Sequence, residues 1–477
     1  MIFEKLPRSS RIVCTLGPAS DDPQILEQMI RAGMNVARLN FSHGSHESHR
    51  ETFNRLRAAS KIVGREVAIL QDLQGHKVRA GQVAETEGLE LPLGHKIRMG
   101  AGDLVTSQRI GIDYEKIAGF VEPGHHIYLD DGMIELAVLS KKGEDFICEV
   151  IIGGILKSRK GVIFPHSDLE FPLINEKDLA DARFGVDLGV DMVAMSFVRS
   201  ATEILEMRIR MGGWGAPDIF IVAKIEDRKG IENLEEILHV ADGILIARGD
   251  MGVTQPREQV PAIQAQIIQL ANARGVPVIT ATQMLESMIQ AHRPTRAEVT
   301  DVFGAIVAGS DAVMLSGETA SGRYPLQAVQ EMDRICRAAE KMTKKRQLGI
   351  TWIEGKEEIH DRMAEATATL VNNMKSRCVV AFSLSGSILR SLSSARLEVP
   401  VYAVVGSERV SRQLQLHRGL SIETLPRKDQ LSELIDFMLD RLTSEKIIST
   451  GDRVVVIASE IDARNRLVHL TKVYVMD

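Results

Sequence analysis

The sequence predicts an α/β fold whose largest part is a (β/α)8 barrel of the TIM type. Short β-branched runs alternate with segments in which apolar residues recur at helical spacing. Three of these strand–helix units precede a glycine-rich stretch and five follow it, so that the chain holds eight. Eight parallel strands, each followed by a helix, are typical of a closed barrel. A doubly wound open sheet has the same local pattern and stays the alternative.

The strand-like runs of the barrel are short and apolar, and helix-start signals separate them. After the first run, Asp21 and Asp22 stand before Pro23, a pattern that favours the first turn of a helix. The eight runs are residues 11–17, 35–41, 67–73, 192–198, 219–225, 243–247, 276–281 and 312–315.

The alternation of strand-like and helical segments stops after residue 79 and resumes near residue 167. Residues 80–166 hold many glycines and short alternating runs, with little helical periodicity. We therefore expect an inserted small β-barrel lid domain there, and a barrel domain made of residues 1–79 and 167–344. Residues 345–477 form a second block of alternating strand-like and helical segments, which predicts a C-terminal α/β domain.

Composition limits the classes of partner. The formal net charge is -6, which argues against nucleic acid or an anionic membrane surface as the main partner. No apolar run approaches the roughly 20 residues that span a bilayer, and residues 1–10 do not resemble a signal peptide. The four cysteines, Cys14, Cys148, Cys336 and Cys378, have no metal-ligand or redox spacing. Buried free thiols in a reducing cytoplasm are therefore expected.

Lys224 and Glu226 lie at the end of the fifth strand-like run. Residues two apart on a strand point to the same side, so the ammonium and the carboxylate are expected side by side. A lysine buried alone is costly, and an ion pair at a strand edge is one interpretation. The other is a cation beside a carboxylate in an active site, which such barrels carry at the C-terminal ends of their strands.

Arg248, Gly249 and Asp250 follow the next run. Strand parity predicts that Arg248 and Asp250 share a side, and Gly249 lets the backbone approach a ligand closely. Glu226 and Asp250 come from adjacent strands, and Mg²⁺ is typically held by one or two carboxylates together with substrate and water oxygens. The pattern predicts a site for Mg²⁺ or Mn²⁺ made by these two carboxylates.

Two arginines are candidate phosphate ligands, because a guanidinium pairs with phosphate through two hydrogen bonds. They are Arg38 in the second run and Arg79 after the third. Asn40, Ser42 and His43 add small polar groups beside Arg38. For either arginine alone, a solvated surface charge is the competing interpretation. Parity also pairs Thr280 with Thr282, and Ser316 with Glu318, at the ends of the last two barrel runs.

Together these segments resemble the pyruvate kinase family. The likeness extends from about residue 11 to residue 325, includes the insertion, and is weaker beyond residue 345. The matching motifs are Ala37-Arg-Leu-Asn-Phe-Ser-His-Gly44, Asp72-Leu-Gln-Gly75, Ala223-Lys-Ile-Glu226, Ala247-Arg-Gly-Asp250, Ile279-Thr-Ala-Thr-Gln-Met-Leu-Glu-Ser-Met288 and Met314-Leu-Ser-Gly-Glu-Thr-Ala320.

The resemblance implies a reaction and an architecture. The reaction moves a phosphoryl group from phosphoenolpyruvate to ADP, giving pyruvate and ATP, as the last step of glycolysis. The architecture is a catalytic barrel, a mobile lid and a C-terminal regulatory domain, usually in a cytoplasmic homotetramer.

The resemblance also implies roles for single residues. Lys224 stabilises the transferring phosphoryl group and the enolate, and Arg38 binds the phosphate. Glu226 and Asp250 hold the divalent ion, and the Gly249 region receives the substrate carboxylate. Thr282, with Ser316, lies near the path that delivers a proton to the enolate, although the donor atom is left open. Asn40, His43, Arg79 and Lys160 lie on the nucleotide side.

Four residues depart from the family pattern. His76 replaces a proline at the hinge into the lid, and Ile163 stands where an asparagine is common. Gly304 and Ala308 replace an asparagine and an aspartate on a barrel helix. None of these changes removes a catalytic group, and all bear on lid movement or local packing.

The monovalent-cation region differs as well. Family members that need K⁺ typically have a hydroxyl where this chain has Leu73 and a glutamate where it has Lys77, close to Asn40, Ser42 and Asp72. The Asp-Leu-Gln-Gly…Lys pattern resembles K⁺-independent members. Because an ammonium is a compact monovalent charge, Lys77 is expected to replace K⁺. The competing interpretation is that Lys77 points to solvent and K⁺ binds weakly.

The C-terminal block carries a candidate effector site. Ser383, Ser385, Gly386 and Ser387 lie between a strand-like run and a helix, where hydroxyls and backbone amides suit a phosphate. A phosphorylated effector and an ordinary helix cap are both compatible with this pattern. The later glycine-rich loop expected of fructose 1,6-bisphosphate binders is missing from residues 458–465.

Two other functions remain possible on these residues. One is a different Mg²⁺-dependent barrel enzyme acting on pyruvate-like acids, such as a lyase. The other is a weakly active paralogue with a regulatory role.

Overall fold

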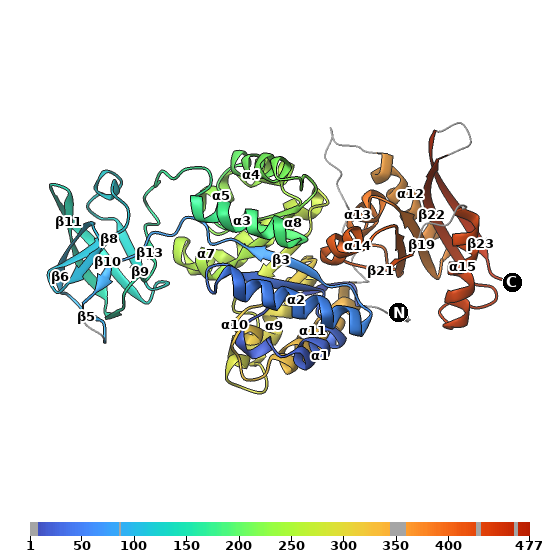
Figure 1. Ribbon diagram of the computed structural model, residues 1–477, viewed down its shortest axis with the longest axis horizontal. Helices are drawn as coiled ribbons and strands as arrows, with labels where there is room; N and C mark the ends of the chain where they lie inside the picture. Colours follow the sequence, from blue (N-terminus) through green and yellow to red (C-terminus); the bar gives the residue numbers. More distant parts are fainter. Residues whose placement is uncertain (1–7, 85–86, 344–358, 426–430, 462–465) are drawn as a thin grey trace.

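The computed structural model describes residues 8–84, 87–343, 359–425, 431–461 and 466–477. Three bodies follow one another along the long axis of the molecule (Figure 1). A sheet-rich domain lies at one end, a barrel ringed by helices lies in the middle, and a smaller α/β domain lies at the other end. The expected switch from barrel to C-terminal domain, at residues 344 and 345, lies outside the described residues.

The central barrel is closed, which confirms the predicted fold class and excludes the doubly wound alternative. Its strands pair in the order β1-β18-β17-β16-β15-β14-β3-β2, and every pair is parallel. The strands are β1 Arg11–Thr15, β2 Val36–Asn40, β3 Ala68–Asp72, β14 Met192–Met195, β15 Phe220–Ile225, β16 Gly243–Ala247, β17 Val278–Ala281 and β18 Ala312–Leu315.

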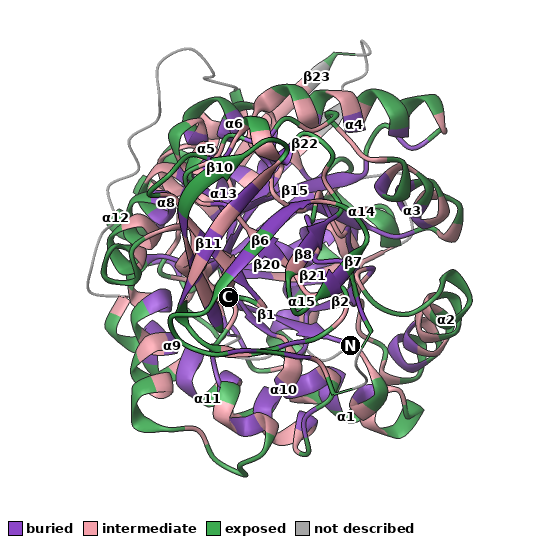
Figure 2. Ribbon diagram, turned by 90° about the vertical axis from the view of Figure 1, so that its left-hand side faces the viewer, coloured by how far each residue is buried: buried purple, intermediate pink, exposed green. Residues whose placement is uncertain are grey.

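Helices surround the barrel and turn their apolar sides inward, which Figure 2 shows as buried faces toward the strands and exposed faces outside. Hydroxyl and carboxamide caps define several of their starts, for example Ser45 before α2 and Thr295 before α9. The helices are α1 Pro23–Ala32, α2 His46–Val63, α3 Glu176–Leu188, α4 Ala201–Gly213, α5 Arg228–Glu232, α6 Leu234–Val240, α7 Arg248–Thr254, α8 Val260–Ala273, α9 Arg296–Ala308, α10 Gly317–Ala320 and α11 Pro325–Thr343.

The inserted domain is made of strands, as predicted, and has its own apolar core. Its strand pairing gives an eight-stranded sheet in the order β13-β9-β10-β11-β6-β8-β7-β4 and a two-stranded sheet of β12 and β5, in place of one closed barrel. The strands are β4 Gln82–Val83, β5 Leu89–Leu91, β6 Lys96–Ala101, β7 Leu104–Thr106, β8 Arg109–Ile112, β9 His126–Leu129, β10 Ile134–Lys142, β11 Asp145–Ile152, β12 Gly154–Leu156 and β13 Val162–Ile163.

The C-terminal domain is a five-stranded sheet in the order β21-β20-β19-β22-β23, in which only β23 runs antiparallel to its neighbour. Its strands are β19 Cys378–Ser383, β20 Val401–Val405, β21 Leu420–Thr424, β22 Arg453–Ile461 and β23 Leu467–Val475. Its helices are α12 Ile359–Met374, α13 Ser387–Ser394, α14 Glu408–Gln413 and α15 Leu431–Ser444.

One side chain before every second barrel strand ties that strand to its predecessor. Asn35, Asp191, Asp242 and Asp311 directly precede β2, β14, β16 and β18. Each accepts a hydrogen bond from a backbone N–H of the strand before, at 2.8–3.1 Å. These caps lie at the N-terminal end of the barrel, so they fix neighbouring strands to each other at the end away from the strand C-termini.

The C-terminal domain covers this same end. The Arg11 guanidinium donates to the carbonyls of His417 and Leu420, and the Ser394 hydroxyl donates to the carbonyl of Gly275. The lid and the C-terminal domain therefore contact opposite ends of the barrel (Figure 1). Within the described part of the chain, no helix combines the length and apolar character needed to cross a membrane.

Candidate active site at the lid end of the barrel

A buried ammonium lies at the C-terminal end of β15. Lys224 Nζ is 3.1 Å from Glu226 Oε1 and 3.3 Å from Asp72 Oδ1, and it donates a 2.6 Å hydrogen bond to Ser196 Oγ. The predicted pairing of Lys224 with Glu226 is present in the structure. Asp72 comes from β3, so the cation joins the ends of two strands that are far apart in the sequence.

Charges on the neighbours set the protonation of this group. Burial opposes the charge on Lys224, but Asp72 and Glu226 outweigh that effect and raise its pKa above the ordinary lysine value. The same ammonium, with the Arg38 guanidinium, overcomes burial at Asp72 and lowers the pKa of that carboxyl. At neutral pH the site therefore holds a charged lysine beside an ionised aspartate.

Arg38 is fixed by two contacts. Its Nε donates to Asp72 Oδ2 at 2.5 Å, and its Nη1 donates to Thr15 Oγ1 at 3.0 Å. Asp72 thus bridges Arg38 and Lys224, the two cations that the sequence suggested for a phosphoryl group. Sequence reasoning placed Asp72 only in the monovalent-cation region and missed this bridge.

Ser196 and Phe197 were also missed by sequence reasoning. The Ser196 hydroxyl accepts from Lys224 and donates to the carbonyl of Leu73 at 2.7 Å. Phe197 has a left-handed backbone (φ 54°) and directs its N–H to Glu226 Oε2 at 2.6 Å. Both follow directly after β14, so the available signal was a polar residue at the end of a buried run. Strain of this kind at a non-glycine residue is common at functional sites.

The parity expected for Arg248 and Asp250 is wrong, because the chain enters helix α7 at Arg248 and the two-residue repeat stops there. Arg248 pairs with Asp301 of α9 at 2.7 Å and donates to the carbonyl of Thr282 at 2.7 Å. Asp250 instead lines the cleft beneath the lid. Arg248 therefore supports the backbone of the site from outside.

Thr282 has a left-handed backbone (φ 66°), an outlier for a β-branched residue. Its Oγ1 accepts the N–H of Gly249 at 2.8 Å. A Cβ on Gly249 would come no closer than 3.6 Å to protein atoms, so packing inside the protein does not demand glycine there.

The two-residue repeat also paired Thr280 with Thr282 and Ser316 with Glu318. In the structure, one member of each pair is buried and the other is not. Glu318 is buried and accepts the N–H groups of Leu285 and Ser316, so it caps local backbone. The Thr280 hydroxyl is buried against Ser310 Oγ at 2.7 Å. Both residues are structural, whereas Ser316 and Thr282 remain half-exposed at the strand ends.

A cleft of about 300 Å³ separates the lid from the barrel end. Its lining combines barrel residues with lid residues, including Ser42, His43, Lys77, Arg79, Lys160 and Asp250. Three of the four predicted nucleotide residues thus face one cleft. The fourth, Asn40, accepts the backbone N–H of Ser42 through its side chain and supports the loop that lines the cleft.

The tip of the lid contacts the barrel. A Cβ on Gly132 would lie 3.4 Å from Val253 of α7, and within the lid Lys160 pairs with Asp130 at 2.7 Å. Arg79 donates from Nη1 to the carbonyl of Arg159 at 2.9 Å. Lid residues and barrel residues therefore meet around the same cleft.

Two residues that depart from the family pattern, His76 and Lys77, lie on the first connection from the barrel into the lid. His76 stacks on Phe171 of the second connection, with ring centroids 4.8 Å apart. The exposed Lys77 places Nζ 5.8 Å from the centre of the Phe197 ring. Gly75 before them has φ 74°, and a Cβ there would lie 2.7 Å from that of Ser196. Leu73 packs into the core between barrel and helices.

The other residues that depart from the family pattern lie in the lid and on helix α9. Ile163 ends the lid strand β13 and lines the cleft. Gly304 and Ala308 belong to α9, where a Cβ on Gly304 would meet nothing within 4 Å.

The carboxylates at the barrel mouth fit a divalent cation. Arg38 and Lys224 face three acids, Asp72, Glu226 and Asp250, so negative charge is in excess. Burial is the main reason that the pKa of Glu226 rises to about 7, and repulsion from Asp250 adds to it. Within the described residues no three His, Cys, Asp or Glu side chains gather closely enough to hold a metal alone. Glu226 and Asp250 would therefore share the ion with substrate and water oxygens, as Mg²⁺ prefers.

The Ser383–Ser387 loop lies on the C-terminal domain, far from this mouth (Figure 1). Gly386 has φ 83° and stands before α13 without a side-chain cap. The hydroxyls of Ser385 and Ser387 lie 2.9 Å apart, and Ser383 Oγ accepts the N–H of Gly386 at 2.9 Å.

Comparisons with known proteins agree with this geometry. The family model for the pyruvate kinase barrel domain matches residues 7–329, and the one for the pyruvate kinase alpha/beta domain matches residues 361–470. The pyruvate kinase of Geobacillus stearothermophilus is 40% identical over 475 residues, covering 99% of this chain and 81% of that protein. The pyruvate kinase of Clostridium perfringens is 38% identical over 457 residues, covering 94% of this chain and 96% of that protein. The chain therefore belongs to the pyruvate kinase family.

Proposed function

We propose that the lid end of the barrel transfers the phosphoryl group of phosphoenolpyruvate to ADP. The observation that carries this proposal is the buried Lys224 ammonium held between Asp72 and Glu226, next to Arg38. Phosphoryl transfer depends on positioning and on neutralising charge at the transferred group. Two fixed cations at one barrel mouth supply both requirements.

The contacts support a role for each of the binding residues. Arg38, held by Asp72 and Thr15, presents its remaining N–H groups to the phosphoryl oxygens. Lys224, kept charged by its carboxylate neighbours, stabilises the phosphoryl group in flight and the enolate that remains. The substrate carboxylate takes the N–H of Gly249, which Thr282 Oγ1 occupies in the free protein.

Glu226 and Asp250 hold Mg²⁺ or Mn²⁺, the ions that pyruvate kinases generally use. When bound, the divalent ion neutralises charge on the substrate oxygens. Thr282 and Ser316 line the route by which a proton reaches the enolate carbon. His43, Arg79 and Lys160 bind the ADP phosphates in the cleft under the lid, and Asn40 shapes the loop beside them.

A coupled assay tests the reaction. Wild-type protein with phosphoenolpyruvate and Mg²⁺ is expected to release pyruvate only when ADP is also present, with one ATP formed per pyruvate. Pyruvate released without ADP would instead indicate a hydrolase or a lyase, and no turnover would indicate a regulatory paralogue. No contact in the described residues favours either of these two alternatives.

We also infer that the enzyme does not require K⁺. Leu73 packs into the core and offers no side-chain oxygen, and the Lys77 ammonium lies over Phe197, whose N–H holds Glu226. The exposure of Lys77 leaves weak K⁺ binding as the competing interpretation. Initial rates in KCl and in tetramethylammonium chloride, at one ionic strength, should agree. A large stimulation by K⁺ would reject the inference, and Lys77→Glu should create a cation requirement or lose activity.

The C-terminal domain is proposed to bind a phosphorylated effector at Ser383, Ser385, Gly386 and Ser387. The uncapped start of α13 supports this, because its first N–H groups need acceptors. The hydrogen bonds among the serines also fit an ordinary turn. Titration of sugar monophosphates, sugar bisphosphates and AMP at low phosphoenolpyruvate decides between them, and no response to any of these compounds removes the effector.

A homotetramer and a cytoplasmic location are further proposals that rest on the family. Sedimentation velocity of the full chain tests the first. A mass other than that of four chains rejects it.

A further inference from the structure

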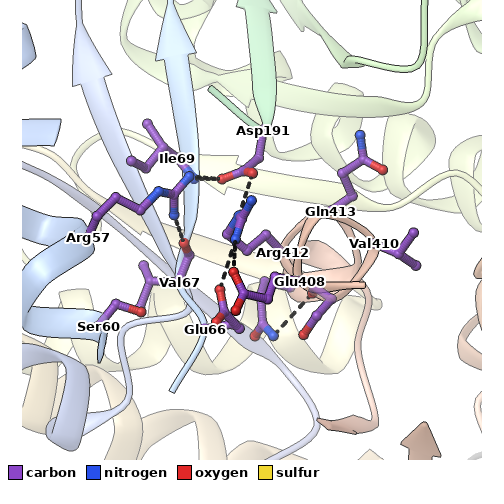
Figure 3. Close-up of polar contacts among 12 residues, drawn as sticks. Arg57, Ser60, Glu66, Val67, Ile69, Asp191, Glu408, Val410, Arg412 and Gln413 are labelled. Carbon is purple, nitrogen blue, oxygen red and sulfur yellow. Dashed lines mark hydrogen bonds and ion pairs between the residues drawn. The ribbon is translucent and has the colours of Figure 1, made fainter. Parts of the chain in front are cut away.

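A buried carboxylate joins the barrel to the C-terminal domain at the end away from the lid (Figure 3). Asp191 is 2% exposed and directly precedes β14. Its Oδ2 accepts from Arg57 of α2 at 2.6 Å, and its Oδ1 accepts from Arg412 of α14 at 2.8 Å. Arg412 is the member of this group that comes from the C-terminal domain.

The same group holds the beginning of β3. The N–H of Ile69 donates to Asp191 Oδ2 at 2.8 Å, and Arg57 Nη1 donates to the carbonyl of Val67 at 2.7 Å. Arg412 Nη1 is also 3.3 Å from Glu66, directly before that strand segment. Figure 3 shows these side chains converging from both domains. The Arg412 guanidinium therefore contacts acids at the N-terminal ends of the adjacent strands β3 and β14.

Those two strands end at the reacting groups. β3 and β14 are paired in register, with Leu70 opposite Met192 and Asp72 opposite Ala194. Asp72 and Ser196, at their C-terminal ends, are the residues that contact Lys224 from these strands. At about 3.3 Å per residue, Asp191 and Ser196 are roughly 16 Å apart along the strand. A hydrogen-bonded strand in a closed barrel cannot stretch, so a shift at one end moves the other.

We propose that Arg412 is a positioning residue for the phosphoryl transfer. It acts by fixing the position of β3 and β14 along the barrel axis. This inference rests on the proposed function of the lid end. The C-terminal domain thereby fixes the distance from Lys224 to its partners without touching the site.

Helix α14 is well placed to transmit a change in its own domain. A Cβ on Gly386 would lie 3.2 Å from Val410 and 3.3 Å from Leu414, so the loop before α13 packs directly on α14. Arg412 lies between these two contacts on the same short segment. A movement of that loop would reach Asp191 through one helical turn.

The alternative is that Arg412 only fastens two domains together. Asp191 keeps its pair with Arg57 when Arg412 is removed, so the barrel cap survives and the two interpretations separate. A fastening role lowers thermal stability and leaves the kinetics of the folded enzyme unchanged. A positioning role changes the kinetics through Ser196.

The experiment compares Arg412→Met, Arg412→Lys and Arg409→Met in the full-length protein. Arg409 is exposed on the same helix and serves as the matched control. We expect Arg412→Met to lower kcat/KM for phosphoenolpyruvate about threefold to tenfold, the usual size of coupling between distant sites. Arg412→Lys, which keeps the charge, should recover part of the loss, and Arg409→Met should match wild type.

A double-mutant cycle with Ser196→Ala identifies the route. If Arg412 acts through β14, its substitution should add little to the loss already caused by Ser196→Ala. Fully additive losses, or a normal kcat/KM in Arg412→Met at a lowered Tm, would overturn the proposal. Should Arg412→Met fail to fold, Arg412→Lys in the same cycle gives the answer. Absence of turnover in wild type would reject the proposed function and this proposal with it, whereas an active wild type with unchanged kcat/KM in Arg412→Met would reject this proposal alone.

Discussion

The two ends of the barrel use the same residue types to opposite effect. At the end covered by the C-terminal domain, the acids that precede barrel strands have arginine partners: Asp191 with Arg57 and Arg412, Asp242 with Arg208, and Asp311 with Arg396. In the group around Lys224 at the lid end, three acids, Asp72, Glu226 and Asp250, face only Lys224 and Arg38, and burial raises the pKa of Glu226.

This difference separates stability from chemistry within one barrel. The charges of these acids are balanced by arginines of the protein, so changes there should act mainly on stability, with the coupling proposed for Arg412 as the exception. Charge at the lid end is left for an ion and a substrate to balance, so changes there should act on rate. The predictions below test that division, from the largest effect to the smallest.

The largest effect is expected at Lys224. Lys224→Met removes the ammonium that we propose neutralises the phosphoryl group, and kcat should fall about a thousandfold. Asp72 keeps its pair with Arg38, so the fold should survive. Steady-state kinetics and circular dichroism measure the two properties. A variant with near-normal kcat would refute the role of Lys224.

At the covered end, Asp311→Asn should destabilise the protein and spare the rate. Asp311 accepts from Arg396, which is 11% exposed at its side chain, and from the N–H of Val278. An uncompensated buried guanidinium costs about 3 kcal/mol, so Tm should fall by several degrees while kcat stays unchanged. Asp187→Asn, which breaks an exposed pair with Arg183, is the control and should shift Tm little. A large loss of kcat in Asp311→Asn would break the comparison.

Removal of the divalent ion should matter only at the lid end. MgCl2 at about a hundred times its Kd should stabilise wild type by about 2.7 kcal/mol, because the ion binds the folded state. Glu226→Gln removes one of the two carboxylates proposed to bind the ion and should abolish this rise in Tm. Thermal unfolding with EDTA and with MgCl2 measures the effect without any assay of activity. An equal rise in both proteins would place the ion elsewhere.

The smallest effect concerns pH at the covered end. Burial, with the charges of Arg390 and Arg11, lowers the pKa of His417 to about 3. The unfolded chain takes up this proton near pH 6.5 and the folded chain does not, so stability is lost as pH falls from about 6.5 toward 3. The expected slope is about 1.4 kcal/mol per pH unit.

His417→Gln tests this contribution because it removes the titrating ring. Its Tm should decline less steeply than that of wild type between pH 6.5 and pH 4.5. Equal slopes in the two proteins would show that His417 is protonated in the folded state.

Local sequence predicted the strands well where turn residues bound them closely. β16 and β18 have the predicted limits, since Asp242 and Asp311 cap their starts. β17 was predicted two residues too long, because Val276 and Pro277 continue the apolar run while the chain is still turning. Arg248 was assigned to a strand face because helix α7 begins without a proline or a capping side chain.

The sequence by itself determined the eight strand–helix units, the family, and the neighbours that the two-residue repeat brings together, such as Lys224 and Glu226. It did so because periodicity and short motifs are local properties. Only the tertiary structure decided that Asp72 bridges Arg38 and Lys224, and that Arg412 contacts Asp191 across 221 residues of chain. Those contacts depend on the closure and register of the barrel and on where the C-terminal domain docks, and packing between distant segments sets both.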